Sequence, residues 1–141
     1  MAAFHKDLVA LSPGDEMPQS EFGPMTRTHF VRYAGAGGDF NPIHHDEEFA
    51  RSAGMPSVFG MGLLHGGLLG QRLAEWVGLA NIRAYSIRFT GQVWPGDVLS
   101  FAGRVESVRQ VGVDMLAELS LSVSRQDGNP AIRATALAVV R

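Results

Sequence analysis

The second half of the chain alternates apolar and polar residues in the way that antiparallel strands with one buried face do. The alternation predicts four strands, over residues 85–93, 99–105, 111–123 and 132–140. Turn sequences separate some of these strands, Pro-Gly-Asp at residues 95–97 and Asp-Gly-Asn-Pro at residues 127–130. The third strand is the most regular, because every second residue from Val111 to Val123 is apolar. We therefore expect an antiparallel sheet with one apolar face.

The longest apolar segment, residues 61–77, places large apolar side chains in nearly every direction around a helix. A helix of that kind is buried, and this one is too short and too often interrupted by polar residues to span a membrane. Small residues recur in it at every fourth position, at Gly62, Gly66, Gly70, Ala74 and Gly78. This stripe predicts that a sheet or another helix closely approaches the backbone. We expect His65, inside the segment, to be a hydrogen-bonded or interface histidine.

The first residues of the chain predict an edge strand and a helix. A turn at residues 12–15 precedes a short, mostly polar run, in which Pro18 excludes a central strand. Thr26 is a suitable N-cap for a helix over residues 27–34, and Gly35 is a suitable end.

A second short helix and the length of the chain complete the expected architecture. Three acidic residues at positions 46–48 suit a helix N-terminus, and Gly54 ends that helix. The 141 residues suit one domain that is large enough to bury a core. The patterns predict a single α+β domain over residues 1–141, with the long helix lying on the sheet.

Asp39 and His44 lie five positions apart on a segment that cannot form a regular helix. Pro42 fixes its own backbone and biases Asn41 towards an extended conformation, and several glycines precede Asp39. A rigid irregular segment can direct an acid and an imidazole at one point, which favours acid/base catalysis. A structural role stays open, because Asx-Pro is ordinary turn chemistry and Asp39 can cap the helix that follows.

Gly60 directly precedes the long helix. If the helix begins just after it, the Gly60 N–H is one of the unpaired donors at the positive end of the helix dipole. An N–H in that place suits the stabilisation of an oxyanion.

Composition excludes several classes of function. The chain has no cysteine, so disulfides, thiol nucleophiles and thiolate metal sites are excluded, and a reducing cytoplasm suits it. A net charge of -2 with scattered basic residues does not favour nucleic-acid binding, and residues 1–10 lack the apolar core of a secretion signal.

A metal site from His44, His45 and Asp46 is disfavoured, because adjacent side chains point apart. His45 is expected to be solvated or to cap a helix.

The segment over residues 33–50 resembles the signature of the MaoC-like dehydratases, also called R-specific enoyl-CoA hydratases or hydratase 2. The resemblance centres on Gly-Asp-Phe-Asn-Pro-Ile-His at residues 38–44, followed by Ala50. Gly60 with Met61, and the strand, turn and strand over residues 89–99, are similar to later features of that family in the same order. The family commonly has a histidine immediately before this glycine, where the present chain has Phe59.

The resemblance implies the hotdog fold, with the sheet wrapped around the helix, in a homodimer or hotdog heterodimer whose sheets join edge to edge. It implies a hydro-lyase that adds water to trans-2-enoyl thioesters of CoA or acyl-carrier protein, giving (3R)-3-hydroxyacyl thioesters, or that runs the reverse reaction. No cofactor and no metal are implied.

The resemblance also implies roles for single residues. Asp39 and His44 would bind the water and transfer protons, and the Gly60 N–H would polarise the thioester carbonyl. Asn41 would orient the loop or the thioester. Arg88 and Arg104, on the polar faces of strands, are candidates for contacts with CoA phosphates, although surface arginines are more often simply solvated.

Two other functions share these features. A hotdog thioesterase also uses an acid near a helix N-terminus, but it hydrolyses the thioester and releases a thiol. A non-catalytic acyl-binding subunit would pair with a different hotdog chain and be inactive alone.

Overall fold

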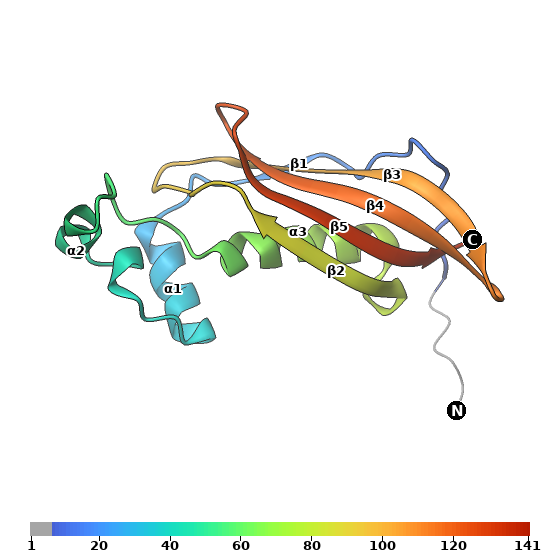
Figure 1. The fold of residues 1–141 in the computed structure, drawn as a ribbon, viewed down its shortest axis with the longest axis horizontal. Helices are drawn as coiled ribbons and strands as arrows, with labels where there is room; N and C mark the ends of the chain where they lie inside the picture. Colours follow the sequence, from blue (N-terminus) through green and yellow to red (C-terminus); the bar gives the residue numbers. More distant parts are fainter. Residues whose placement is uncertain (1–6) are drawn as a thin grey trace.

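The computed structural model describes residues 7–141, which form a five-stranded antiparallel sheet with a long helix against one face (Figure 1). The elements in chain order are β1 (Ser20–Phe22), α1 (Arg27–Gly37), the 3-10 helix η1 (Pro42–His44), α2 (Glu47–Ser52), α3 (Gly62–Val77), the 3-10 helix η2 (Leu79–Asn81), β2 (Ile82–Phe89), β3 (Leu99–Val111), β4 (Asp114–Arg125) and β5 (Pro130–Val140). The strand order across the sheet is β1-β3-β4-β5-β2. The α+β prediction and the edge position of the first strand are confirmed. The predictions for residues 1–10 and for a domain over residues 1–141 extend beyond the described residues.

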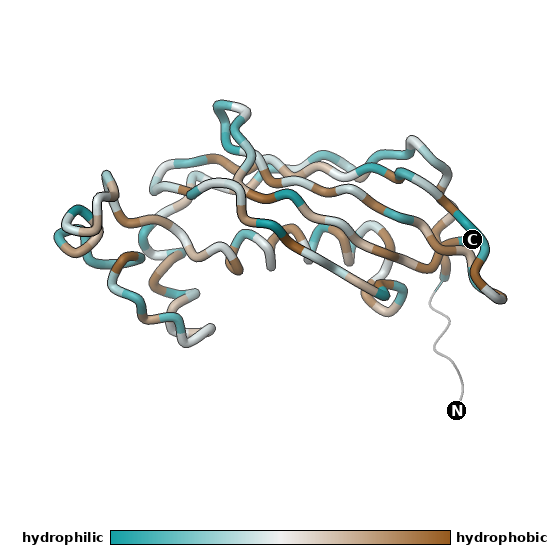
Figure 2. The backbone as a smooth tube through the Cα atoms, viewed as in Figure 1, coloured by the Kyte–Doolittle hydropathy of each residue, from teal (hydrophilic) through white to brown (hydrophobic). Residues whose placement is uncertain are grey.

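Strand β4 keeps the predicted alternation, which Figure 2 shows as alternating colours along the strands. Four of its inward residues are buried, Ala117, Leu119, Leu121 and Val123, and Met115 at its start is partly buried. The prediction of one strand over residues 111–123 is wrong at its start. Gly112, with a φ of 62°, reverses the chain between β3 and β4, and Val113 in that turn is 98% exposed. The apolar alternation in the sequence therefore continues through a hairpin turn, and Gly112 is the one residue there that indicates the turn.

Strand β2 ends at Phe89, four residues before the predicted end. The N–H groups of Thr90 and Gly91 still donate to the Ala131 carbonyl, at 2.9 and 3.3 Å, and the chain then leaves the sheet. Val93 is fully buried although it lies in the loop. Its burial explains why it matched the apolar face of a strand, and its position lets its carbonyl face the segment before α3.

The small-residue stripe of α3 faces β2, as the prediction of close approach requires. A Cβ atom added at Gly62 would lie 2.6 Å from the Phe89 ring, and one added at Gly66 would lie 2.7 Å from Ile87 Cδ1. The next position, Gly70, faces Tyr85, whose hydroxyl donates to the Gly66 carbonyl at 2.8 Å. The stripe therefore lets the helix backbone rest on the side chains of β2.

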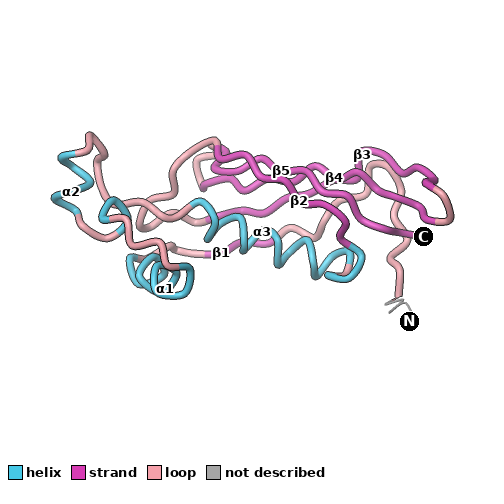
Figure 3. The backbone as a smooth tube through the Cα atoms, turned by 60° about the horizontal axis from the view of Figure 1, so that its bottom comes forward, coloured by secondary structure: helices cyan, strands magenta, loops and turns pink. Residues whose placement is uncertain are grey.

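The opposite side of α3 is open in the single chain, which corrects the prediction that the helix is buried all round. Leu63 is 62% exposed, and Gly67, Gln71 and Glu75, each four positions further along, are exposed too. The sheet covers one face of the helix and does not enclose it (Figure 3). No helix within residues 7–141 is long and apolar enough to cross a bilayer.

Helix α1 begins at the predicted cap but ends three residues later than predicted. The Thr26 hydroxyl accepts the His29 N–H at 3.3 Å, and His29 Nδ1 accepts the Thr26 N–H at 2.9 Å. Gly38, with a φ of 73°, ends the helix, so Gly35 lies inside it. Helices α1 and α2 lie beyond one end of the sheet, the end at which α3 starts, with α2 farther from α3 than α1 is (Figures 1 and 3).

Candidate active site

A cavity of about 590 Å³ lies where the loop after α1, the start of α3 and the end of β2 meet. Three predicted site residues line it: Asp39, His44 and Gly60. Aromatic and apolar side chains contribute further walls: Tyr33, Phe59, Met61, Leu63 and Phe89. The cavity therefore combines titratable groups with an apolar lining, as small-molecule sites do.

His44 is fixed by the backbone of Phe59. Its Nδ1 lies 2.6 Å from the Phe59 carbonyl oxygen, and the side chain is 11% exposed. A carbonyl can only accept a hydrogen bond, so Nδ1 carries the proton. In the neutral ring, Nε2 is then the unprotonated nitrogen, and it faces Asp39. This arrangement leaves a lone pair on Nε2 that can act as a base.

Asp39 lies opposite that nitrogen. Its Oδ2 is 3.5 Å from His44 Nε2, and its other oxygen, Oδ1, accepts the Asn41 N–H at 3.3 Å. The carboxylate is 46% exposed, so it is open to solvent while the imidazole is buried. The left-handed Gly38 turns the chain after α1, and η1, which ends at His44, turns it again, which brings the two side chains together.

Asn41 caps η1 with its side chain. Its Oδ1 accepts the Ile43 N–H at 3.1 Å, which replaces the predicted cap by Asp39. Asn41 is exposed and is not among the described residues that line the cavity. The contacts fit the loop-orienting role that the sequence suggested, and they do not place its side chain on a ligand in the cavity.

The prediction of an unpaired Gly60 N–H is wrong. That N–H donates to the Val93 carbonyl at 2.8 Å, and α3 begins only at Gly62. Within residues 7–141 the N–H groups without an acceptor at this end are those of the N-cap Met61 and of the helical residues Gly62 and Leu63, since Leu64 donates to the Met61 carbonyl at 3.0 Å. All three residues line the cavity, so the positive helix end still faces it.

Position 60 requires glycine for a different reason, because a larger residue has no space there. A Cβ atom there would lie 2.6 Å from His65 Cε1 and 2.8 Å from Phe30 Cε1. Real Cβ contacts are not that short, so any other residue would displace one of these rings. The glycine thus lets the segment pass between α1 and α3.

Phe59 is a site residue that the sequence marked only as a departure from the family pattern. Its ring packs edge-on against His44, with centroids 5.1 Å apart, and against Trp94, with centroids 5.8 Å apart. The substitution of the usual histidine therefore keeps the backbone carbonyl that orients His44. The departure from the family pattern drew attention to this position but did not indicate its contact with His44.

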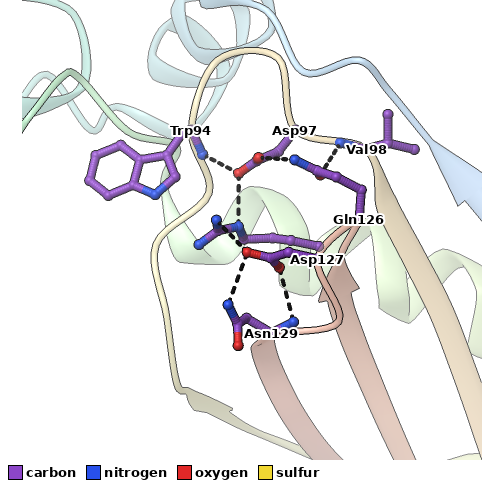
Figure 4. Close-up of polar contacts among 7 residues, drawn as sticks. Trp94, Asp97, Val98, Gln126, Asp127 and Asn129 are labelled. Carbon is purple, nitrogen blue, oxygen red and sulfur yellow. Dashed lines mark hydrogen bonds and ion pairs between the residues drawn. The ribbon is translucent and has the colours of Figure 1, made fainter.

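A buried carboxylate anchors the loop that carries Val93. Asp97 is 5% exposed, its Oδ2 accepts the Trp94 N–H at 2.8 Å, and its Oδ1 accepts from Gln126 Nε2 at 2.8 Å (Figure 4). Arg125 adds an ion pair at 3.2 Å. The β4–β5 turn therefore holds the loop whose Val93 carbonyl positions Gly60.

A second cluster of polar contacts links α1, α2 and the segment that leads to Gly60. Arg27 at the start of α1 lies 2.6 Å from Glu47 of α2, and this hydrogen bond holds the pKa of the Glu47 carboxyl below its usual value. The same carboxylate accepts from the Ser57 hydroxyl at 3.2 Å and from the Val58 N–H at 3.4 Å. These contacts tie both short helices to the segment that leads to Gly60.

His65 departs in part from its predicted role. It is 2% exposed and lines the cavity, yet neither Nδ1 nor Nε2 makes a hydrogen bond of good geometry with residues 7–141. Burial lowers its pKa to about 4, so the ring is neutral at pH 7. The Gly60 backbone beside the ring partly offsets this lowering, so the expected hydrogen bond is at most a weak one, and the expected interface role stays a prediction.

Arg88 and Arg104 lie away from the cavity. Arg88 pairs in register with Arg133 across β2 and β5, where both border a separate surface depression. Arg104 borders another depression near Met17. The structure thus does not bring either arginine to Asp39 and His44.

The residues considered for a metal site do not converge. His44 is buried, whereas His45 and Asp46 are exposed, and Asp46 accepts the Phe49 N–H at 3.0 Å as the N-cap of α2. Within residues 7–141, no group of three His, Asp or Glu residues is arranged to hold a metal ion.

Comparisons with known proteins agree on one family. The model of the MaoC like domain matches residues 9–125. A 3-hydroxyacyl-thioester dehydratase of Mycobacterium tuberculosis is 36% identical over 90 residues, which cover 61% of this chain and 31% of the relative. The chain thus matches about a third of that protein's length.

Two solved structures share the hotdog fold of that family. The (R)-hydratase from A. caviae involved in PHA biosynthesis superimposes with a TM-score of 0.80 at 22% identity, over 93% of this chain and 98% of that one. A chain of the ChsH1-ChsH2 complex from Mycobacterium tuberculosis superimposes with a TM-score of 0.77 at 24% identity, over 92% and 98% of the two chains. At these identities the likeness concerns the fold.

Proposed function

Because the chain belongs to the MaoC-like dehydratase family, we propose that it catalyses the reversible hydration of trans-2-enoyl thioesters to (3R)-3-hydroxyacyl thioesters. The observation that carries this proposal is the approach of Asp39 Oδ2 to His44 Nε2, at 3.5 Å, on the wall of the cavity. Hydration requires a base for water and a proton for C2, and these two groups meet the requirement. The family membership and the relative named as a dehydratase support the same reaction.

The proposed mechanism uses both groups as acceptors for one water molecule. The water donates one hydrogen to His44 Nε2 and one to the Asp39 carboxylate, so its lone pair is free to attack C3. His44 takes the proton, and Asp39 stabilises the imidazolium that forms. The proton then passes to C2, so that OH and H are added across the double bond and both residues return to their starting states.

Charge develops on the thioester oxygen during this addition. In the proposal, the unpaired N–H groups of Gly62 and Leu63 donate hydrogen bonds to that oxygen, in place of the Gly60 N–H. A helix N-terminus carries about half a positive charge, and preorganised N–H donors stabilise oxyanions strongly in a water-poor cavity. The exposed rings of Phe40 and Phe89, near the cavity, offer apolar surface to the acyl group or its carrier arm.

We also include a partner chain in the proposal. The open side of α3 exposes Leu63, and one structural neighbour comes from a complex of two different components. A second hotdog chain, identical or different, is the partner that this exposed surface suits.

The test is incubation of the purified protein with crotonyl-CoA. Hydration removes the absorbance of the conjugated enoyl group, releases no thiol and gives the (3R) product. Release of free CoA would instead indicate a thioesterase. If the protein alone is inactive and a second hotdog chain restores hydration, the non-catalytic subunit is the correct alternative.

A further inference from the structure

His65 is a buried polar side chain for which the proposed mechanism has no use. It lies in the first turns of α3 with 2% of its surface exposed, and neither ring nitrogen makes a hydrogen bond of good geometry within residues 7–141, although the ring lies against the Gly60 backbone, which is a weak partner at best. Buried polar groups are normally satisfied, because an unmade hydrogen bond carries the full cost of removing the group from water. Apolar residues fill comparable positions of this helix, such as Leu69 and Leu73. The hydrogen-bonding capacity of this ring is therefore largely unused by the described residues, and the ring lines the cavity.

The ring is placed where a ligand in the cavity could use this capacity. Side chains on a helix lean towards its N-terminus, so His65 leans towards the segment before α3. Its Cε1 and Nε2 atoms are the atoms that a Cβ added at Gly60 would meet, at 2.6 and 2.8 Å. Gly60, His65 and the start of α3 all line the same cavity. The imidazole edge thus borders the wall where the unpaired N–H groups of Gly62 and Leu63 lie.

We propose that His65 is a substrate-contacting residue, whose imidazole N–H donates to the carbonyl oxygen of the bound acyl thioester. This inference rests on the proposed function and names a third donor for the same oxygen. The ring is suited to donate without charge, because burial lowers its pKa to about 4 and the helix dipole also disfavours a cation at this end. A neutral imidazole N–H polarises the thioester carbonyl, and it does so without a positive charge that would attract the general base.

The test compares His65→Leu with His65→Gln, using butyryl-CoA as an unreactive saturated thioester. The leucine variant removes both ring nitrogens, and we expect about tenfold weaker binding of butyryl-CoA, the size of one hydrogen bond. Glutamine keeps an N–H donor and should recover part of the affinity. Binding of free CoA, which has no thioester carbonyl, should be unchanged in both variants.

Thermal stability separates this role from a structural one. Removal of an unsatisfied buried group should leave the Tm of His65→Leu unchanged or raised while hydration of crotonyl-CoA falls, and kcat should fall more than KM rises. A lowered Tm, an equal loss of affinity for free CoA, or unchanged butyryl-CoA binding would each overturn the proposal. The last result would also indicate that His65 holds only a buried water.

The two levels of inference fail in different ways. If the wild-type protein hydrates no enoyl thioester, the proposed function fails, and the binding of butyryl-CoA to the two variants still tests His65. If the wild-type protein is active and His65→Leu has the same kcat/KM and affinity, the role of His65 fails alone.

Discussion

The Nδ1 atom of His44 lies 2.6 Å from the carbonyl oxygen of Phe59. This contact fixes the orientation of the imidazole and requires a proton on Nδ1, so that in the neutral ring Nε2 faces Asp39 with its lone pair. The residue type at position 59 matters less than its backbone, which explains how phenylalanine can stand where the family commonly has histidine.

Phe59→His should therefore retain activity. The carbonyl oxygen stays in place and a ring of similar shape still packs on His44, so we expect kcat/KM for crotonyl-CoA to change by less than about tenfold. Phe59→Ala keeps the carbonyl but removes edge-on packing worth about 1 kcal/mol, and it should lower kcat/KM further. A larger loss with histidine than with alanine would contradict the importance of packing at this position.

The glycine stripe of α3 gives a matched pair of stability measurements. A Cβ at Gly66 would lie 2.7 Å from Ile87 Cδ1, whereas a Cβ at Gly67 meets no atom within 4 Å. We expect Gly66→Ala to lower the free energy of unfolding in urea by about 1 kcal/mol, because the displacement of Ile87 outweighs the helix preference of alanine. Gly67→Ala should raise it by up to about 1 kcal/mol, because alanine favours a helix. Equal effects of the two substitutions would contradict the close packing of α3 on β2.

Asp97 should be important for stability because it anchors the loop next to the site. Asp97→Asn keeps the shape but removes the charge that Arg125 and Gln126 contact, at 3.2 and 2.8 Å. We expect a loss of about 2 kcal/mol in the free energy of unfolding, typical of buried hydrogen bonds to a charged group. Glu75→Gln, on the exposed side of α3, is the control and should have a much smaller effect. A neutral Asp97→Asn would show that the loop is held by other contacts.

His65 predicts a specific dependence of stability on pH. Its pKa is lowered to about 4 in the folded protein from an unfolded value of 6.5, so below pH 6.5 the unfolded chain binds more protons than the folded one. The free energy of unfolding should therefore fall as the pH decreases from 6.5 to about 4, and the unfavourable protonation of His65 alone should account for a loss of about 3 kcal/mol. Above pH 6.5 the contribution is constant.

Urea unfolding of the wild type and His65→Leu at pH 7 and pH 4.5 measures this contribution. All other titrating groups are shared, so the stability difference between the two proteins isolates His65. The difference should shift in favour of the leucine variant at the lower pH. A difference that does not change with pH would show that His65 titrates normally.

The sequence predicted the elements better than it predicted their ends and surroundings. Alternation identified the strands, and the four-residue recurrence from Gly62 correctly indicated close packing, because both patterns are local consequences of burial. Val93 and Val111 misled the strand assignments, since a buried loop residue and a residue beside a turn are as apolar as strand residues. The open face of α3 was also missed, because an apolar residue such as Leu63 carries no sign of what covers it.

The candidate site was predictable only in part. Asp39 and His44 were selected by residue type, by the proline between them and by the family resemblance, and the structure brings them to one cavity. The pairing of the Gly60 N–H with Val93 was hidden, because it depends on a loop 33 residues further along the chain. The unsatisfied nitrogens of His65 were hidden for the same reason, since hydrogen bonding in a folded core depends on distant segments.

The rate of crotonyl-CoA hydration by His44→Gln, relative to the wild type, tests the central claim most directly. Glutamine can still donate to the Phe59 carbonyl, so the fold should be kept, but it offers no nitrogen base towards Asp39. The proposed mechanism predicts an active wild type and a loss of about 10²–10⁴-fold in the variant, with an unchanged Tm. A His44→Gln protein that hydrates crotonyl-CoA at the wild-type rate would contradict it.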